Sequence, residues 1–291
     1  MNPKYVVVIP AHNEAQFIGL TLQSLVAQTA IPYKVVVVDD NSTDTTSAVV
    51  QEFCQKYPYI SLINNPSEAA HLPGSKVIRA FQAGFDALGK DFEIVVKLDA
   101  DLILPLDYFE TILTYFDDDM AVGMAGGFAY IENNKGEWVL ENLTDKDHIR
   151  GAFKAYRRAC LDEIGGLKPA MGWDTVDELL CHYYGWKVVT DARLKVKHLK
   201  PTGANYNNKA RYKQGEAFYS LGYGLLITGI SSAKLAFMKK KPGLFLDYMT
   251  GYFRALWQRK PLLVTSDQAQ FIRRYRWQKM KQKLSKTTES L

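Results

Sequence analysis

The sequence predicts an α/β protein with a doubly wound, mostly parallel central sheet flanked by helices, followed by a helical C-terminal region. Two observations predict this fold class. Over residues 1–110, short apolar runs alternate with segments of helical spacing, and parallel strands need helical crossovers of this kind. From about residue 203 the pattern becomes helical, aromatic and basic. The length of 291 residues fits one or two domains.

The elements of the first part follow in order along the chain. Each expected strand is a short apolar run, and each expected helix spaces its apolar residues by three or four. The expected strands are 5–9, 33–38, 59–63 and 92–98. The expected helices are 14–28, 43–57 and 76–88, the second with Ser42, Thr43 or Asp44 as its N-cap. The pattern of residues 120–200 is mixed, with strands expected near 121–130 and 187–196.

The charge is divided unevenly along the chain. The formal net charge is +5, but residues 234–286 contain 14 Lys or Arg and only two acids, a balance of +12. Subtracting this and the single charge of Glu289 leaves −6 for the first 233 residues. An acidic body with a basic, aromatic tail indicates either a solvated helical face or contact with an anionic surface.

The N-terminus and the cysteines predict where the protein works. The first apolar run is too short for the core of a signal peptide or for a membrane span. Cys54, Cys160 and Cys181 are single and widely spaced, which is typical of reduced thiols in a cytosolic protein. We therefore expect a cytoplasmic protein.

Polar segments follow three of the expected strands. Residues 10–14, 39–44 and 99–101 each stand where an apolar run ends. Ligands of doubly wound sheets bind beyond the carboxyl ends of the strands, so these segments predict one shared crevice. The segment 39–44 also contains cap residues, so a plain helix start explains it about equally well.

Asp99 and Asp101 are the strongest candidates for metal ligands. They follow the run Ile94–Leu98, and alternate residues at a strand end point to the same face. Two carboxylates suit Mg²⁺ or Mn²⁺, which would also bind a diphosphate. A polar turn after the strand is the competing interpretation. The same Asp-x-Asp spacing at 117–119 and 145–147 lies in acidic loops, where we expect no site.

Taken together, these segments resemble family 2 glycosyltransferases of the GT-A fold. The order and spacing of the matching segments are specific, although each is loose by itself. The resemblance spans about residues 4–200. It rests on residues 10–14 (PAHNE), 38–44 (VDDNSTD), 74–84, 98–101 (LDAD), 151–157 (GAFKAYR), 164–166 (IGG), 172–178 (GWDTVDE), 185–188 (GWKV) and 196–198 (VKH).

The resemblance implies a role for each matching residue on the donor side. Asp39 would recognise the base of a nucleotide sugar, and Asp99 would approach the ribose or the sugar. Asp101 would bind Mn²⁺ or Mg²⁺, with His198 as a further ligand. A lone His between lysines is otherwise more often an exposed surface residue. The nucleotide pocket would be lined by Pro10, Ala11 and Glu14, with Lys76 or Arg79 beside it.

The resemblance also implies a general base within residues 172–178. Family members usually have Glu-Asp there, whereas this chain has Asp174 and, three residues later, Asp177. Counting back from Gly185 aligns Asp174 with the family Asp, and Asp177 stays open as the alternative. The base would take a proton from an acceptor hydroxyl, and direct displacement would invert the anomeric configuration. Capping of a helix by these acids is compatible with catalysis.

The C-terminal region departs from the family's processive members. Their Gln-x-x-Arg-Trp motif is not met, because Gln270 and Arg273 are followed by Arg274. We therefore expect transfer of a single sugar. The aromatic residues of 203–291 are explained by core packing or by helices on an anionic leaflet. Nucleic-acid binding is not expected, because no known module accompanies the charge.

The sequence thus predicts a GT-A catalytic domain at 1–202 and a basic, aromatic helical region at 203–291. Residues 1–110 would bind the nucleotide and 111–202 the acceptor, while 203–291 would contact a membrane surface or the acceptor. The expected function is metal-dependent transfer of one sugar from a UDP donor, with GDP or dTDP open, to a saccharide or lipid-linked acceptor. The enzyme would build surface polysaccharide or glycolipid, peripherally at the inner face of the membrane.

Three competing functions stay open at this point. A sugar nucleotidyltransferase would have a glycine- and arginine-rich loop after the first strand, and residues 10–14 lack it. A phospho-acceptor signalling domain would have its acidic pair after the first strand rather than the second. A catalytically silent, membrane-associated binding protein would not need Asp99, Asp101 and Asp174 together.

Overall fold

The computed structural model describes residues 3–66, 74–141, 146–200 and 211–288. The chain divides into two compact units, residues 1–202 and 203–291, and each is described by itself. The strands of the first unit are β1 (Tyr5–Ala11), β2 (Lys34–Asp39), β3 (Ile60–Asn64), β4 (Ile94–Leu98), β5 (Leu102–Ile103), β6 (Val122–Glu132), β7 (Trp138–Leu140), β8 (Phe153–Arg157) and β9 (Lys187–His198). Its helices are α1 (Ile18–Val26), α2 (Thr46–Lys56), α3 (Ser75–Asp86), α4 (Tyr108–Asp118), α5 (Arg158–Glu163) and α6 (Trp173–Tyr183).

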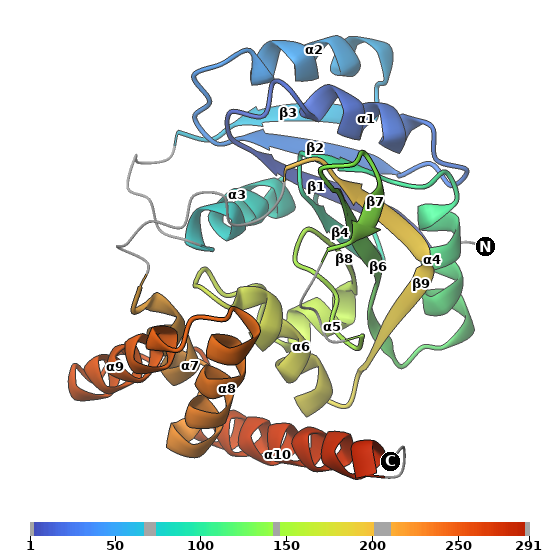
Figure 1. The fold of residues 1–291 in the computed structure, drawn as a ribbon. Coiled ribbons are helices and arrows are strands. Elements are labelled where there is room, and N and C mark those ends of the chain that lie inside the picture. Colours follow the sequence, from blue (N-terminus) through green and yellow to red (C-terminus); the bar gives the residue numbers. More distant parts are fainter. Residues whose placement is uncertain (1–2, 67–73, 142–145, 201–210, 289–291) are drawn as a thin grey trace. The chain divides into compact units, whose positions relative to one another are not determined.

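A single curled sheet forms the centre of the first unit (Figure 1). Its strand order is β3-β2-β1-β4-β8-β6-β9-β5, with β7 paired to β6. The four strands at one side, β3-β2-β1-β4, are parallel, and their valines and isoleucines are almost all buried. Helices α1 and α2 lie on one side of these strands and α3 on the other (Figure 1). The predicted α/β fold, doubly wound at this side, is confirmed.

The sheet becomes mixed beyond β4. Strand β8 runs antiparallel to β4 and to β6, whereas β6 and β9 are parallel. The strands expected near 121–130 and 187–196 are therefore both present, as β6 and β9. The β4–β8 pairing places Lys97 directly beside Lys154 in the register, a juxtaposition that matters for the site.

The first two helices begin later than the periodicity predicts. Helix α1 begins at Ile18 because residues 14–17 form a turn in which the Glu14 carbonyl accepts the N–H groups of Phe17 and Ile18. Helix α2 begins at Thr46, and none of the three expected residues is its N-cap. Asp44 instead accepts a hydrogen bond from the Thr46 N–H at 3.0 Å, which supplies the same kind of stabilisation from one residue further out.

Helix α3 begins at Ser75, directly after Gly74, and the backbone at Gly74 accommodates only glycine. Gly74 has φ +74°, and a Cβ there would lie 2.7 Å from the carbonyl oxygen of Ala170. The start of α3 therefore lies directly against the segment that leads into α6. This contact holds the beginning of α3 close to the second half of the same unit.

The second unit is helical, as predicted. It comprises α7 (Lys213–Ser220), α8 (Gly224–Met238), α9 (Gly243–Trp257) and α10 (Ser266–Thr288). Helices α7 and α9 cross closely at Gly215 and Gly251, where a Cβ would meet the backbone of the facing helix. Buried aromatic rings, including Phe218, Tyr248 and Tyr252, fill the space between the helices. Within the described part of the chain, no helix combines the length and apolar character needed to span a bilayer.

Candidate functional site

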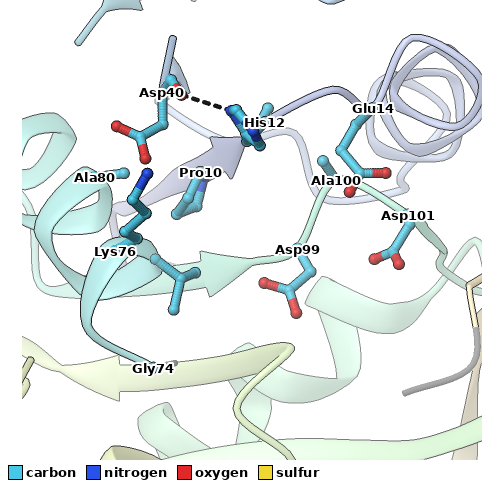
Figure 2. A pocket seen from close by; sticks show the side chains of 12 residues that line it. Pro10, His12, Glu14, Asp40, Gly74, Lys76, Ala80, Asp99, Ala100 and Asp101 are labelled. Carbon is cyan, nitrogen blue, oxygen red and sulfur yellow. Dashed lines mark hydrogen bonds between the residues drawn. The ribbon is translucent and has the colours of Figure 1, made fainter. Parts of the chain in front are cut away.

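A pocket of about 340 Å³ lies at the carboxyl ends of β1, β2 and β4 (Figure 2). This is where polar segments after three strands were expected to meet, so the predicted crevice exists. The start of α3 closes one wall of the pocket. The lining residues are Pro10, Ala11, His12, Glu14, Asp40, Gly74, Lys76, Val77, Ala80, Asp99, Ala100 and Asp101.

The loop after β1 is held in one conformation by the loop after β2. Asn13 has a positive φ of 55°, and its side-chain oxygen accepts the Thr43 N–H at 2.8 Å. The Glu14 N–H in turn donates to the Thr46 hydroxyl at 2.8 Å. The His12 ring and the backbone oxygen of Asp40 are 2.7 Å apart. These hydrogen bonds between the two loops fix the direction in which the side chains of the first loop face the pocket.

Glu14 lies on the pocket wall with one oxygen engaged and one without a partner. Its Oε1 accepts a hydrogen bond from Lys200 Nζ at 2.9 Å, whereas Oε2 is buried without a hydrogen bond from any described residue. Burial raises the pKa of Glu14, and the negative charges of Asp101 and Asp99 raise it further. Lys200 lowers this pKa but does not outweigh the other effects. An orphaned acceptor in a pocket indicates a place for a donor group of a ligand.

Asp99 is held by a lysine from inside the sheet. The Lys97 ammonium, only 2% exposed, forms an ion pair with Asp99, which is 31% exposed and lines the pocket. Burial raises the pKa of Asp99, and the charge of Lys97 opposes this. The Asp99 N–H donates to the carbonyl of Ala152 on the neighbouring segment at 2.7 Å. Both the backbone and the side chain of Asp99 are therefore fixed.

Asp101 belongs to a buried chain of polar groups. His198 Nε2 lies 3.4 Å from Asp101 Oδ2, and His198 Nδ1 lies 2.8 Å from Glu141 Oε2. Arg150 is paired with the same oxygen of Glu141 at 3.1 Å. Burial alone would lower the pKa of His198, but the two carboxylates raise it to about 9. His198 is thus buried beside the predicted metal residue rather than exposed at the surface.

This pair of residues suits a divalent cation. Asp101 Oδ2 and His198 Nε2 are close enough for both to reach one ion at about 2.1 Å. The contact from His198 Nδ1 to a carboxylate is the outer interaction that metal-bound histidines usually make. No three His, Cys, Asp or Glu side chains in the described ranges form a metal-binding group by themselves.

The two candidates for the general base have different surroundings. Helix α6 begins at Trp173 after Gly172, which puts Asp174 in its first turn. The Asp174 side chain is 36% exposed, and its Oδ2 lies 3.9 Å from His148 Nε2. The other ring nitrogen of His148 lies 2.8 Å from the carboxylate of Glu178. Asp174 therefore has an accessible carboxylate beside an oriented imidazole.

Asp177 is buried, and both of its oxygens have partners. Lys154 Nζ donates to them at 2.9 and 3.0 Å, and the Tyr156 hydroxyl donates to Oδ2 at 2.6 Å. Lys154 also pairs with Glu178 at 3.0 Å and donates to the backbone oxygen of Asp174 at 2.5 Å. The pKa of Lys154 is raised because the nearby acids outweigh its burial. These bonds hold the first turns of α6 against β8.

The other predicted site residues are divided between the pocket and its surroundings. Lys76 lines the pocket, and Figure 2 shows its amino group pointing toward Asp40. Arg79 is exposed on α3 and is not part of the lining. Asp39 is buried next to the pocket, where its carboxylate accepts the Ser42 N–H at 2.9 Å and the Ser47 hydroxyl.

Sequence reasoning missed several residues of this region. His148, which lies beside Asp174, was not expected. His12 and Asp40 line the pocket and stand within the predicted segments 10–14 and 39–44, but neither had a role of its own. Lys97 and Lys154 are buried under the ring of Trp173, with ammonium-to-centroid distances of 5.2 and 5.9 Å. A charged residue inside an otherwise apolar strand was the available signal, because an ion is buried only together with a partner. His148 carried no comparable signal.

The mixed α/β sheet whose parallel strands end at this pocket is the fold of solved GT-A glycosyltransferases. The solved structures that resemble this chain include the mannosyltransferase PcManGT from Pyrobaculum calidifontis in complex with GDP-Man and Mn²⁺. Its TM-score is 0.59 at 17% identity, covering 94% of this chain and 79% of that one. S. aureus TarS 1–349 in complex with UDP has a TM-score of 0.57 at 16% identity, covering 79% and 65%. At such identities the likeness shows the fold.

The sequence comparison identifies the family. The sequence model of the family 'Glycosyl transferase family 2' matches residues 6–169, which is more than half of the chain. The chain therefore belongs to this family. The probable glycosyltransferase YdaM of Bacillus subtilis is 33% identical over 189 residues, which is 56% of this chain and 43% of that protein. The β-monoglucosyldiacylglycerol synthase of Synechocystis is 24% identical over 293 residues, 90% of this chain and 59% of that protein. The chain spans about half the length of these relatives.

Proposed function

We propose that the protein is a metal-dependent, inverting glycosyltransferase that transfers one sugar from a nucleotide-sugar donor to an acceptor hydroxyl. The observation that carries this proposal is the pocket at the strand ends, where Asp99 and Asp101 lie together. Family membership supports sugar transfer, and the GDP-Man, UDP and UDP-GlcNAc bound to the solved neighbours support a nucleotide-sugar donor.

The donor would occupy the pocket of the half formed by residues 1–110. Pro10 and Ala11 would form an apolar wall of the donor site. Glu14, one of whose oxygens has no hydrogen-bond partner among the described residues, would accept a hydroxyl of the donor. Lys76 brings a positive charge to the same pocket, with Arg79 nearby on α3. Asp39 would read the base from beside the pocket. Uridine is our first choice of base, with guanosine and thymidine as the alternatives.

Asp101 and His198 would hold Mn²⁺ or Mg²⁺, and Asp99 would contact the ribose or the sugar. The bound ion supplies neutralisation of the negative charge that develops on the departing nucleoside diphosphate. The contact with Glu141 orients the His198 ring. Lys97 keeps Asp99 in place, because its ammonium is buried against that carboxylate.

Asp174 is the better candidate for the general base. The base must be accessible to the acceptor hydroxyl and must have an oxygen free to take its proton. Asp174 meets both conditions, whereas Asp177 is buried with partners on both oxygens. Asp174 also lies near Asp99, because Gly151, next to Ala152, packs against Trp173 and Asp174. Attack from the side opposite the leaving group inverts the anomeric carbon.

The acceptor would be a saccharide or a lipid-linked saccharide bound by residues 111–202. The Synechocystis relative, which aligns along most of this chain, is by its name a synthase of a glucosylated diacylglycerol. This supports a role in glycolipid or surface polysaccharide synthesis, peripherally at the inner face of the membrane. Residues 203–291 would provide the contact with membrane or acceptor.

Calorimetric titration with UDP, GDP and dTDP, each with Mn²⁺ and with EDTA, tests the proposal. We expect one nucleotide to bind tightly and only with the metal. Asp101→Ala should abolish this metal-dependent binding. Asp117→Ala should leave it unchanged, because Asp117, although it has the same spacing to Asp119, lies at the end of helix α4 rather than in the acidic loop expected from the sequence. Folded protein that binds none of the three nucleotides would contradict the proposed donor site.

A further inference from the structure

Helix α8 of the second unit buries two hydroxyls beside Ile227 and Ala236 and exposes large apolar side chains. Thr228 and Ser232 point inward with no exposed area, and neither hydroxyl has a hydrogen-bond partner among the described residues. Leu226 and Phe237 point outward, 65% and 86% exposed. A helix that met only water on this side would have the opposite arrangement.

The exposed apolar residues of α8 form one stripe. Leu226, Ile230 and Phe237 are separated by four and seven residues, which places them on one face of the helix. Ala233 completes this face and is also exposed. No charged residue interrupts the stripe between Leu226 and Phe237 on this face, because Lys234 lies at its edge.

Helix α9 packs against α8 and has a matching stripe. Leu246, Phe253 and Trp257 follow the same spacing of seven and four residues, and Trp257 is 90% exposed. The opposite face of α9 is already occupied, because Tyr248 and Tyr252 contact aromatic rings of α7. The outward stripe of α9 therefore cannot be the side that holds the unit together.

Cations surround these stripes, and acids are nearly absent. Residues 224–259 contain six Lys or Arg and a single acid, Asp247. That acid is buried and paired with Arg211 at 2.7 Å. Three of the cations are consecutive and exposed at the turn between the two helices. The six are Lys234, Lys239, Lys240, Lys241, Arg254 and Arg259.

We propose that the outward faces of α8 and α9 bind an anionic phospholipid leaflet, with both helices lying in the plane of the interface. The apolar stripes, defined by Leu226, Ile230, Phe237, Leu246, Phe253 and Trp257, enter the boundary between head groups and acyl chains. The surrounding lysines and arginines meet the lipid phosphates, and their long side chains reach the head groups while their stems stay apolar.

Charge complementarity selects the lipid over a second copy of the chain. Two copies that met through this face would bring six cations against six, without acids to compensate them. An anionic leaflet supplies negative charge around an apolar interior, which is the inverse of this surface. Helix α10 is also basic, but its exposed side is mostly polar, so it would add attraction without insertion.

This surface deepens the membrane contact of the proposed function and rests on it. Its test does not depend on sugar transfer, because binding to vesicles is measured without donor or acceptor. If the chain binds the nucleotide but not the vesicles, the membrane-binding surface is refuted and the donor site is not. If the chain binds the vesicles but none of the nucleotides, the donor site is refuted and the membrane-binding surface is not.

The experiment is co-flotation of the full chain with vesicles of phosphatidylcholine mixed with phosphatidylglycerol, against vesicles of phosphatidylcholine alone. We expect binding to the anionic vesicles, weaker binding to the neutral ones, and partial release by salt, because screening removes only the ionic part. Tryptophan emission should move to shorter wavelength on binding, and Trp257→Ser should lose most of this shift.

Two variants separate insertion from charge. Phe237→Ser with Trp257→Ser should weaken binding about a hundredfold, since each of the two buried aromatic side chains accounts for about a tenfold change. Replacement of Lys239, Lys240 and Lys241 by Gln should weaken the preference for anionic lipid, and the remaining preference would come from the other cations of this surface and of α10. The matched control is Leu106→Ser with Met120→Ser, two similarly exposed apolar residues of the first unit, which should bind like the unmodified chain.

Three results would overturn the proposal. The first is absence of binding to anionic vesicles by the folded chain. The second is unchanged binding of the Phe237→Ser, Trp257→Ser variant, which would assign the attraction to charges such as those of α10. The third is a dimer in light scattering that the same variant converts to a monomer, which would assign the face to a second copy.

Discussion

The first unit buries charges, whereas the second exposes large apolar side chains. In residues 1–202, Lys97 and Lys154 lie inside the sheet, and each has a carboxylate partner. In residues 203–291, Phe237 and Trp257 face outward. Buried ions with complete partners hold side chains in fixed positions, which a site for chemistry requires. Apolar groups facing water stabilise nothing in the unit itself, so they indicate a surface that meets another apolar phase.

Replacement of the proposed base is expected to have the largest effect and would show that chemistry belongs to the first unit. Asp174→Asn keeps the size and position of the side chain but removes the proton acceptor. We expect transfer to fall about 10²- to 10⁴-fold with donor binding unchanged. The measurement is release of nucleoside diphosphate from the donor that calorimetry identifies. Asp177→Asn is the comparison: it should lower the free energy of unfolding, because Asp177 is the counter-ion of Lys154.

Full transfer activity in Asp174→Asn would contradict the assignment. If Asp177→Asn then abolished transfer while its stability stayed normal, the base would be Asp177. The buried ion pair would in that case take part in chemistry as well as in structure.

The next largest effect tests how strongly the first unit depends on its buried ions. Lys154→Met leaves Asp177 without its cation in a fully enclosed position. We expect the free energy of unfolding to fall by about 3–5 kcal/mol, measured by urea denaturation. Lys187→Met is the matched control, because Lys187 is 62% exposed and pairs with Asp119 at the surface. A loss no larger than that of the control would show that burial of the pair does not matter.

The smallest expected effect is on stability, when an exposed phenylalanine of the second unit is replaced. Phe237→Ala should change the free energy of unfolding by less than about 0.5 kcal/mol, because the ring is almost fully exposed. Phe218→Ala should lower it by about 3–5 kcal/mol, because that ring is 5% exposed and stacked on Tyr223. Equal losses in thermal or urea unfolding would mean that Phe237 packs within the unit, which would remove the reason for an apolar partner.

Much of the first unit was predictable because its signals are local. Apolar runs such as Ile94–Leu98 identify strands, and polar residues directly after them identify the edge where the pocket lies. The pairing of Asp101 with His198 came only from family resemblance, because no local pattern connects residues so far apart. Helix α1 begins later than its periodicity predicts, because the residues from Glu14 onward form a turn instead of the first turn of the helix.

The sequence by itself determined the α/β fold, the edge of the sheet that carries the pocket, the acidic residues there and the family. Only the tertiary structure decided that Asp177 is buried and Asp174 accessible, that Lys97 and Lys154 are neighbours, and which face of α8 is outward. The physical reason is range. Strand and helix periodicity depends on residues a few positions apart, whereas burial and ion pairing depend on segments that become neighbours only when the sheet and helices pack.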